Sequence, residues 1–243
     1  MRVVLDFQTT FAVPKLMKMK TILNFAAIAA LGFLASCGGA ESTEGATDVA
    51  TTEDANKKTE EVSLVDGEYA IDPAQSTCNW KGTKITGDTH VGTLTMHKGS
   101  VTVIDQVIAN GLAAVDMNSM VCTDEGMDEE AKGNLIGHLK SDDFFGVEQF
   151  PYARLEVEGM KSKEGTTYVN GKIFVREIGQ PINFPVTITQ EDNQLIIDAK
   201  VTFDRSKHDV KFRSGAFPDL FPDLGDKLIN DDIELDVHLV ATR

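Results

Sequence analysis

The residue types that most often carry out catalysis are scattered along this chain rather than grouped. The five histidines are far apart in the sequence, at His90, His97, His138, His208 and His238. The chain has no His-Glu-x-x-His zinc motif, no Gly-x-Ser-x-Gly nucleophile turn and no glycine-rich phosphate loop. The adjacent Asp142 and Asp143 precede two phenylalanines, a position more typical of a helix cap than of an acid–base pair. We therefore expect neither an enzyme nor a bound metal or cofactor.

One basic cluster stands out in a chain whose formal net charge is −15. Five basic side chains fall within nine residues: Arg205, Lys207, His208, Lys211 and Arg213. One interpretation is a solvated loop whose charges pair with Asp204 and Asp209. The other is an anion contact at the mouth of a cavity, suited to a phosphate or another polar head. The acidity of the whole chain argues against nucleic acid as a partner, because phosphate backbones require basic surfaces.

An aromatic segment at residues 138–155 is the other feature with functional potential. It carries Phe144, Phe145 and Phe150, and burial of one such ring contributes about 1.5–3 kcal/mol. Gly146 and Pro151 divide the segment, which predicts a one-turn helix and a loop that leads into a strand. The rings either plug the end of a β-structure or line the mouth of a pocket. We expect Phe144 and Phe145 to point inward, with Asp142 or Asp143 capping the turn.

The elements that position these residues are mostly short strands. Apolar residues alternate with polar ones, as in a strand with one buried face, in Leu195–Phe203 and Asp232–Thr242. Further strands are predicted at Gly67–Ile71, Ser76–Thr83, His90–His97, Ser100–Ile104, Val107–Asp116, Thr167–Val175 and Pro181–Thr189, and around Leu155. Lys98-Gly99 is expected to be a hairpin turn and Asn110-Gly111 a bend or bulge. Met127–Leu139 is predicted to be a short helix.

This pattern predicts an all-β fold, an antiparallel eight-stranded barrel with one or two short helices. Such a barrel is just wide enough to be filled by side chains or to hold one small ligand. A β-sandwich is the alternative. The long loop between Arg205 and Asn230 is expected to fold over one end of the barrel.

The first 36 residues have the pattern of a secretory signal peptide. Two lysines precede an apolar run at residues 22–34 that is too short to span a membrane. The following Leu34-Ala35-Ser36-Cys37 resembles a bacterial lipobox, in which the cysteine is lipidated and becomes the first mature residue. Residues 1–16 do not fit this pattern, and we expect translation to begin at Met17 or Met19. Residues 37–66 are predicted to be the lipidated cysteine and a flexible acidic tether, and residues 67–243 the folded domain.

Two cysteines, Cys78 and Cys122, remain beside Cys37. In an extracytoplasmic compartment they either form a disulfide or stay as separate small residues.

A family resemblance extends over residues 67–241. The sequence resembles the YceI-like family in the motifs Tyr69-x-Ile71-Asp72-x-x-x-Ser76, Trp80-Lys81-Gly82-x-Lys84, His90-x-Gly92, His138-Leu139-Lys140-Ser141-x-Asp143-Phe144-Phe145-x-Val147-x-x-Phe150-Pro151, Phe203-Asp204-Arg205, Ser214-Gly215 and Leu224-Gly225-Asp226-x-Leu228-Ile229. With its lipoprotein signal, the chain is most similar to members from the Bacteroidota.

The resemblance implies a lipocalin-like barrel that holds an isoprenoid chain and has no catalytic activity. On this basis we expect an extracytoplasmic lipoprotein that binds a quinone or polyprenyl chain for transport or storage. Its anchor would place it on the periplasmic face of the outer membrane or on the cell surface, and a homodimer is left open. The expected ligand-binding residues are Trp80, His90, Phe144, Phe145, Phe150, Phe203, Arg205 and Phe212, with His90 and Arg205 near the mouth. The alternative is an envelope stress or interaction protein with a packed, ligand-free barrel.

Overall fold

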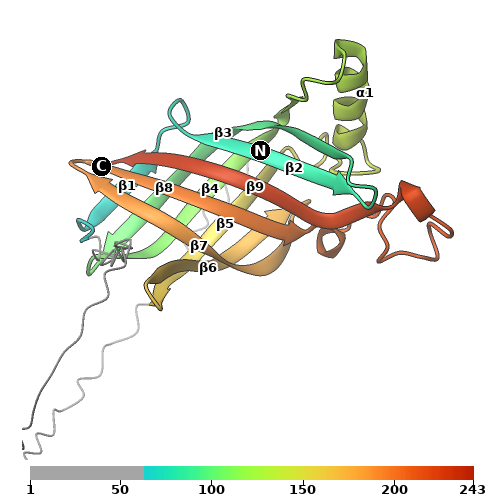
Figure 1. Cartoon of the computed structure of the whole chain (residues 1–243). Helices are drawn as coiled ribbons and strands as arrows, with labels where there is room; N and C mark the ends of the chain where they lie inside the picture. Colours follow the sequence, from blue (N-terminus) through green and yellow to red (C-terminus); the bar gives the residue numbers. More distant parts are fainter. Residues whose placement is uncertain (1–62) are drawn as a thin grey trace, which may run out of the picture. The chain divides into compact units, whose positions relative to one another are not determined.

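A computed structural model of the protein describes residues 63–243, which form a closed antiparallel barrel (Figure 1). The predicted signal peptide, Cys37 and most of the predicted tether lie outside the described residues. Residues 63–66, at the end of that predicted tether, pack on the barrel. Leu64 is buried, and the carboxylate of Asp66 accepts hydrogen bonds from the main-chain N–H groups of Asp105 and Gln106. The folded domain therefore begins before residue 67.

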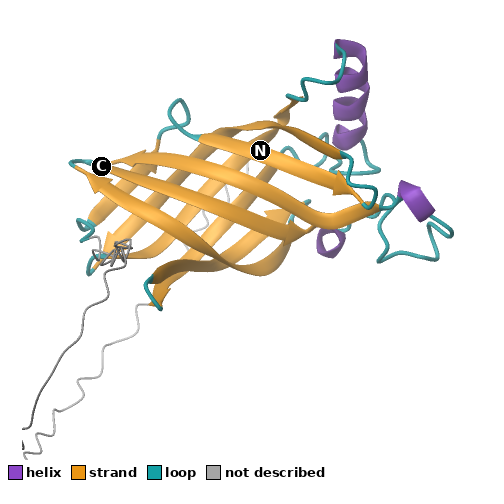
Figure 2. Cartoon of the chain, viewed as in Figure 1, coloured by secondary structure: helices purple, strands orange, loops and turns teal. Residues whose placement is uncertain are grey.

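Nine strands form the barrel, and one helix lies outside it (Figure 2). The strands are β1 (Gly67–Ile71), β2 (Thr77–Lys84), β3 (Thr89–Ile104), β4 (Val107–Cys122), β5 (Tyr152–Lys163), β6 (Thr166–Val175), β7 (Ile178–Glu191), β8 (Gln194–Asp204) and β9 (Ile229–Thr242). The helix is α1 (Glu129–Lys140), and the short 3-10 turns are η1 (Arg205–His208) and η2 (Gly225–Lys227).

The nine strands occupy eight positions around the barrel. They pair in the order β1-β3-β2-β9-β8-β7-β6-β5-β4, and an additional β3–β4 pairing closes the sheet. Both β1 and β2 lie between β3 and β9: β2 pairs with the first part of β3, and β1 pairs with its last part. Thus β1 and β2 share one position, interrupted by the turn at residues 72–76. The predicted eight-stranded antiparallel barrel is confirmed.

The hairpin turn predicted at Lys98-Gly99 is wrong, because β3 continues through it as a single strand. The β3–β4 register shifts between Met96 and Lys98, so the site is a bulge. Gly99 is required there for space rather than for a turn, since a Cβ atom would lie 2.4 Å from the Leu112 carbonyl oxygen. The actual turn follows at Asp105 and Gln106, both with positive φ.

The bend or bulge predicted at Asn110-Gly111 is confirmed as a bulge. Thr102 of β3 is opposite Asn110 of β4, but the next residue, Val103, is opposite Ile108, so β4 has one extra residue here. The predicted helix is also present, at Glu129–Lys140 rather than Met127–Leu139. Its N-cap is Asp128, whose carboxylate accepts a hydrogen bond of 2.8 Å from the Ala131 N–H. None of its residues is buried, and it stands at the end of the barrel to which residues 205–228 also belong (Figure 1).

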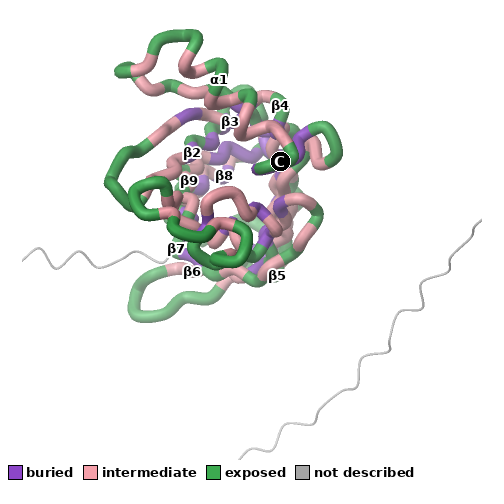
Figure 3. Tube along the Cα trace, turned by 90° about the vertical axis from the view of Figure 1, so that its right-hand side faces the viewer, coloured by how far each residue is buried: buried purple, intermediate pink, exposed green. Residues whose placement is uncertain are grey.

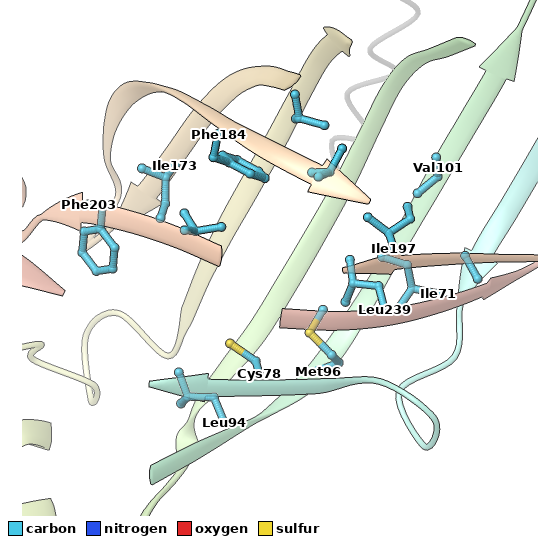
Figure 4. Packing of buried hydrophobic residues seen from close by; sticks show 14 of the residues in the cluster. Ile71, Cys78, Leu94, Met96, Val101, Ile173, Phe184, Ile197, Phe203 and Leu239 are labelled. Atoms are coloured by element: carbon cyan, nitrogen blue, oxygen red, sulfur yellow. The ribbon is translucent and has the colours of Figure 1, made fainter. Parts of the chain in front are cut away.

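The inward faces of the strands are mostly apolar. Viewed along the barrel, the buried positions lie toward the inside of the ring (Figure 3). Ile173, Phe184 and Phe203 approach from one side of the interior, and Cys78 and Met96 from another (Figure 4). This arrangement follows from the two-residue repeat of a strand, which directs alternate side chains into the barrel.

A glycine at a close strand contact gives a test of the barrel. A Cβ atom on Gly171 would lie 2.2 Å from the main-chain carbonyl oxygen of Glu156. We expect Gly171→Ala to lower the free energy of unfolding by about 1–3 kcal/mol, because β5 and β6 must separate. Gly133 in α1 has no neighbour within 4 Å, so Gly133→Ala should raise stability by about 0.5–1 kcal/mol. Urea unfolding of both variants measures these changes in stability, and equal changes would contradict the close contact at Gly171.

Candidate ligand-binding site

The barrel interior contains a cavity of about 430 Å³. Its size is within the usual range for small-molecule sites. The inward faces of β8 and β9 supply part of its wall: Ile197, Ala199, Val201, Phe203, Ile233, Leu235, Val237 and Leu239. These are the positions that the alternating sequence pattern directs inward. The wall is therefore apolar over most of its surface, as the strand periodicity requires.

Aromatic side chains surround one end of the cavity. Phe144, Phe145 and Phe212 all line it, and the first two are 5% and 9% exposed. The ring centroids of Phe144 and Phe212 are 5.3 Å apart. The His138 ring meets the rings of Phe144 and Phe212 edge-on at 5.0 and 4.6 Å. Phe144 and Phe145 thus point inward as expected, and the aromatic segment closes the wall at this end.

Phe150 does not belong to the cavity wall, although the sequence analysis placed it there. The chain turns sharply at Gly146, whose φ is +56°, and the Phe150 N–H donates to the Gly146 carbonyl. Phe150 consequently packs beside Gly146 and faces the guanidinium group of Arg176 at 5.4 Å.

The predicted aspartate cap of this turn is also wrong. Within residues 63–243 neither carboxylate accepts a capping hydrogen bond, and Asp143 instead lies 3.4 Å from His138 Nε2. Arg176 holds the turn in place of a cap. Its Nη1 donates to the carbonyl oxygens of Phe144 at 2.8 Å and Asp209 at 3.2 Å. An arginine from the β6–β7 turn therefore joins the aromatic segment to the loop after β8, a contact that no local sequence pattern reveals.

Trp80 and His90 come from neighbouring strands, β2 and β3, and both line the cavity. Trp80 is 8% exposed, and its indole ring covers Gly92 on β3, where a Cβ atom would lie 2.4 Å from the ring. Its Nε1 has no hydrogen-bond partner among the described residues. The indole ring of Trp80, the only tryptophan in the chain, therefore forms part of the cavity wall.

His90 is oriented by a carboxylate outside the cavity. Its Nδ1 lies 2.7 Å from Asp124 Oδ2, and Asp124 Oδ1 accepts a hydrogen bond from the Val91 N–H at 3.0 Å. Burial opposes ionisation of Asp124, but the hydrogen bonds from His90 and Val91 outweigh it and lower the pKa of this carboxyl. The carboxylate is therefore ionised and fixes one nitrogen of the imidazole.

Arg205 lines the cavity but is committed to the fold. Its side chain is fully buried and donates hydrogen bonds of 3.0–3.1 Å to four main-chain carbonyl oxygens, those of Val210, Phe212, Ile229 and Asn230. Asp231 Oδ1 lies 3.2 Å from Nη2, close enough for an ion pair. Burial lowers the pKa of Arg205, although Asp231 favours its charged form. Of the two interpretations of the basic cluster, neither the solvated loop nor the anion contact describes Arg205, which has a structural role in the loop after β8.

The rest of the basic cluster is divided between the interior and the surface. His208 is buried, its Nδ1 lies 2.8 Å from the Ile178 carbonyl oxygen, and burial lowers its pKa. Lys207 pairs with Asp204 at 3.4 Å, and Lys211 pairs with Asp209 at 2.6 Å. The solvated-loop interpretation therefore holds for the two lysines, and neither interpretation fits His208.

Comparison with known proteins identifies the fold. The family model of the YceI-like domain matches residues 69–241. The chain belongs to the YceI-like family. No curated protein matches its sequence.

Two solved structures share the architecture of this YceI-like domain. BcnA from Burkholderia cenocepacia is 19% identical, with a TM-score of 0.55 over 71% of this chain and 99% of BcnA. A polyisoprenoid-binding domain from Saccharophagus degradans, implicated in plant cell wall breakdown, is 12% identical, with a TM-score of 0.53 over 72% of this chain and 97% of that domain. At these identities the similarity shows the fold.

The disulfide suggested for Cys78 and Cys122 is absent from the YceI-like domain, where both thiols are free. The two residues lie on β2 and β4, with β3 between them. Two strand spacings amount to about 10 Å, beyond the Cα separation that a disulfide bridges. Cys78 lines the cavity, and burial raises the pKa of its thiol to about 12.

Within residues 63–243, no helix has the length and apolar character needed to cross a membrane. In the same residues, no group of three or more His, Cys, Asp or Glu side chains is arranged to hold a metal ion.

The role of Arg205 in the loop predicts a large stability effect. Arg205→Ala removes the donor to four main-chain carbonyl oxygens and leaves Asp231 without its cation. We expect a loss of about 3–5 kcal/mol in the free energy of unfolding, measured by urea denaturation. Lys207→Ala is the matched control in the same turn, and its exposed ion pair should be worth less than about 1 kcal/mol. Similar losses in the two variants would contradict the assignment.

Proposed function

We propose that this YceI-like domain carries the apolar chain of a lipid inside its barrel and that it is a binding protein rather than an enzyme. The observation that carries the proposal is the apolar cavity of about 430 Å³. An ordered water molecule needs two to four polar partners, which the apolar stretches of this wall do not offer. An apolar chain suits such a space, because its burial is favourable and requires no hydrogen bonds.

An isoprenoid chain is the class of ligand that we favour. The support is the fold shared with the Saccharophagus degradans domain, which is described as polyisoprenoid-binding. The wall of the present cavity is compatible with such a chain, because branched aliphatic residues and phenylalanines predominate in it. A quinone or a polyprenyl lipid has the required long apolar part.

The alternative of a packed barrel that serves only as an interaction protein is less well supported. Small residues at inward positions, among them Gly111, Ala113 and Ala199, leave space that larger side chains would fill. A barrel evolved for surface contacts alone has no need of such a space. The cavity therefore favours a carrier.

We further propose that the carrier is an extracytoplasmic lipoprotein anchored through Cys37, for transport or storage of its ligand at the cell envelope. The support is the sequence of residues 1–37, in which a basic start and an apolar run precede Leu34-Ala35-Ser36-Cys37.

Filling the cavity should abolish ligand binding. Ala199 on β8 lines the cavity, whereas the adjacent Lys200 is exposed on the outer face. We expect wild-type protein purified gently to retain a lipid detectable by native mass spectrometry. Ala199→Trp should lose that lipid, and Lys200→Trp should keep it. Circular dichroism and urea unfolding of both variants verify the fold. A lipid-free wild-type protein, or equal retention by both tryptophan variants, would refute the carrier proposal.

The anchor is tested separately. Cys37→Ala should abolish incorporation of a labelled fatty acid and move the protein from the membrane fraction to the soluble fraction of the cell. Cys78→Ala is the control, since its thiol lies inside the barrel. Unchanged labelling of Cys37→Ala would exclude lipidation at this residue.

A further inference from the structure

The charged residues that line the cavity are all basic. They are Lys84, Arg154, Arg205 and Arg213, and no Asp or Glu within residues 63–243 lines it. The whole chain, by contrast, contains 38 acidic and 23 basic residues apart from histidine. Negative charge is thus excluded from the wall of this cavity although it dominates the chain.

Two of the four basic residues are committed to contacts within the protein. Arg205 donates to four carbonyl oxygens, as described above. Arg154 binds Glu156 through Nε at 3.1 Å and Glu177 through Nη1 at 2.6 Å, and its guanidinium group stacks 3.9 Å from the centre of the Phe174 ring. Neither side chain is available to a ligand without loss of these bonds.

Lys84 and Arg213 remain available. The single ion pair of Lys84, with Asp88 at 3.4 Å, is exposed to solvent and contributes little. Arg213 has no carboxylate within 4.0 Å in the described part of the chain. Its guanidinium group lies 5.1 Å from the ring centre of Phe212, which itself belongs to the cavity wall. Arg213 is therefore the half-buried cation of this wall that lacks a charge partner.

The fold places Lys84 and Arg213 beside the same residue of β9. Ile229 is the register partner of Lys84, and the Ile229 N–H donates to the Arg213 carbonyl oxygen at 3.0 Å. Lys84 and His90 also line an open depression on the adjacent surface. Lys84 therefore lies where the cavity approaches solvent, and Arg213 lines the same cavity and is joined by its backbone to the same residue of β9.

The backbone of Arg213 is in a conformation that glycine adopts more easily. Its φ is +49°, in the left-handed region, which costs a residue with a Cβ atom about 1–2 kcal/mol. The backbone conformation therefore does not favour an arginine at this position. Strain of this kind, held by the surrounding structure, is common at ligand-binding positions.

We propose that Arg213, with Lys84 beside it, binds the anionic head of the carried lipid, a phosphate or a carboxylate, at the rim of the cavity. Guanidinium groups bind both anions through paired hydrogen bonds, and a half-buried site strengthens them. The inference rests on the proposed function, because it requires the apolar chain of the ligand to occupy the barrel.

The test compares two probes with the same chain and different heads, geranylgeranyl phosphate and geranylgeraniol. Fluorescence of Trp80, the single tryptophan and part of the cavity wall, reports binding by the delipidated full-length protein. We expect the wild-type protein to prefer the phosphate by about tenfold or more at low salt. Arg213→Gly should lose most of that preference, mainly through weaker binding of the phosphate.

The same variant separates binding from stability. Because glycine relieves the positive φ, Arg213→Gly should be at least as stable as the wild-type protein in urea, so lost binding would not reflect unfolding. Arg213→Lys should recover part of the preference. Lys211→Ala is the matched control, since it removes a nearby positive charge that pairs with Asp209 and does not line the cavity.

Each outcome decides between the proposals. Equal wild-type affinity for both probes, or an unchanged preference in Arg213→Gly, would overturn the anionic-head inference and leave the carrier function intact. If Lys211→Ala lost the preference for the phosphate to the same extent, the preference would reflect the general positive charge of this region. That result would also overturn the inference. Inorganic phosphate that binds as tightly as geranylgeranyl phosphate would assign the site to a free anion. Failure of both lipids to bind would refute the carrier function itself.

Discussion

Closure of the antiparallel sheet is the constraint on which the rest of this structure depends. The β3–β4 pairing closes the sheet, and β1 and β2 together fill the position between β3 and β9. Closure gives every strand a neighbour on both sides and removes the long exposed edges that an open sheet would have. It also directs half of the residues of each strand into one enclosed volume. With eight positions that volume is just large enough for one ligand, and small inward residues such as Ala113 and Ala199 leave it partly open.

The end of the barrel near α1 is organised by arginines that bind main-chain carbonyls. Arg205 gathers the segment around residues 210–212 and the start of β9, and Arg176 joins the aromatic segment to Asp209. Charged side chains hold these loops because loops lack the ladder of hydrogen bonds that strands provide. The aromatic rings then pack against a fixed frame. Arg213 combines one feature of each residue: like Arg205 it lines the cavity, and like Arg176 it makes no ion pair within the described residues.

The contrast between an apolar cavity wall and the few basic residues that line it suggests how such a barrel acquires ligand specificity. In the proposed carrier, the apolar wall would recognise a long chain by shape and hydrophobic burial, which distinguish poorly between related lipids. Polar discrimination would then arise where the chain ends, which we propose is the rim near Lys84 and Arg213. The Burkholderia cenocepacia and Saccharophagus degradans structures share the fold at 19% and 12% identity, so the architecture persists although most residues differ.

The sequence predicted the architecture well because strand periodicity is a local property. The alternation in Leu195–Phe203 and Asp232–Thr242 indicated which side chains face inward, and these residues line the cavity. Phe144 and Phe145 were placed correctly for a related reason, since two adjacent large rings must be buried somewhere. The bulge at Lys98-Gly99 was mistaken for a turn, because a glycine needed for close strand contact has the same sequence signature as a glycine needed for positive φ.

The sequence by itself thus determined the barrel, its apolar interior and the set of residues from which a site could be built. Only the tertiary structure decided their roles. It placed Phe150 outside the wall, kept Cys78 and Cys122 two strands apart, and assigned Arg205 to the loop while leaving Arg213 available. The physical reason is that these outcomes depend on contacts between segments far apart in the chain. A cluster such as Arg205 to Arg213 shows which charges are present, but only the folded backbone decides which of them find an acceptor within the protein.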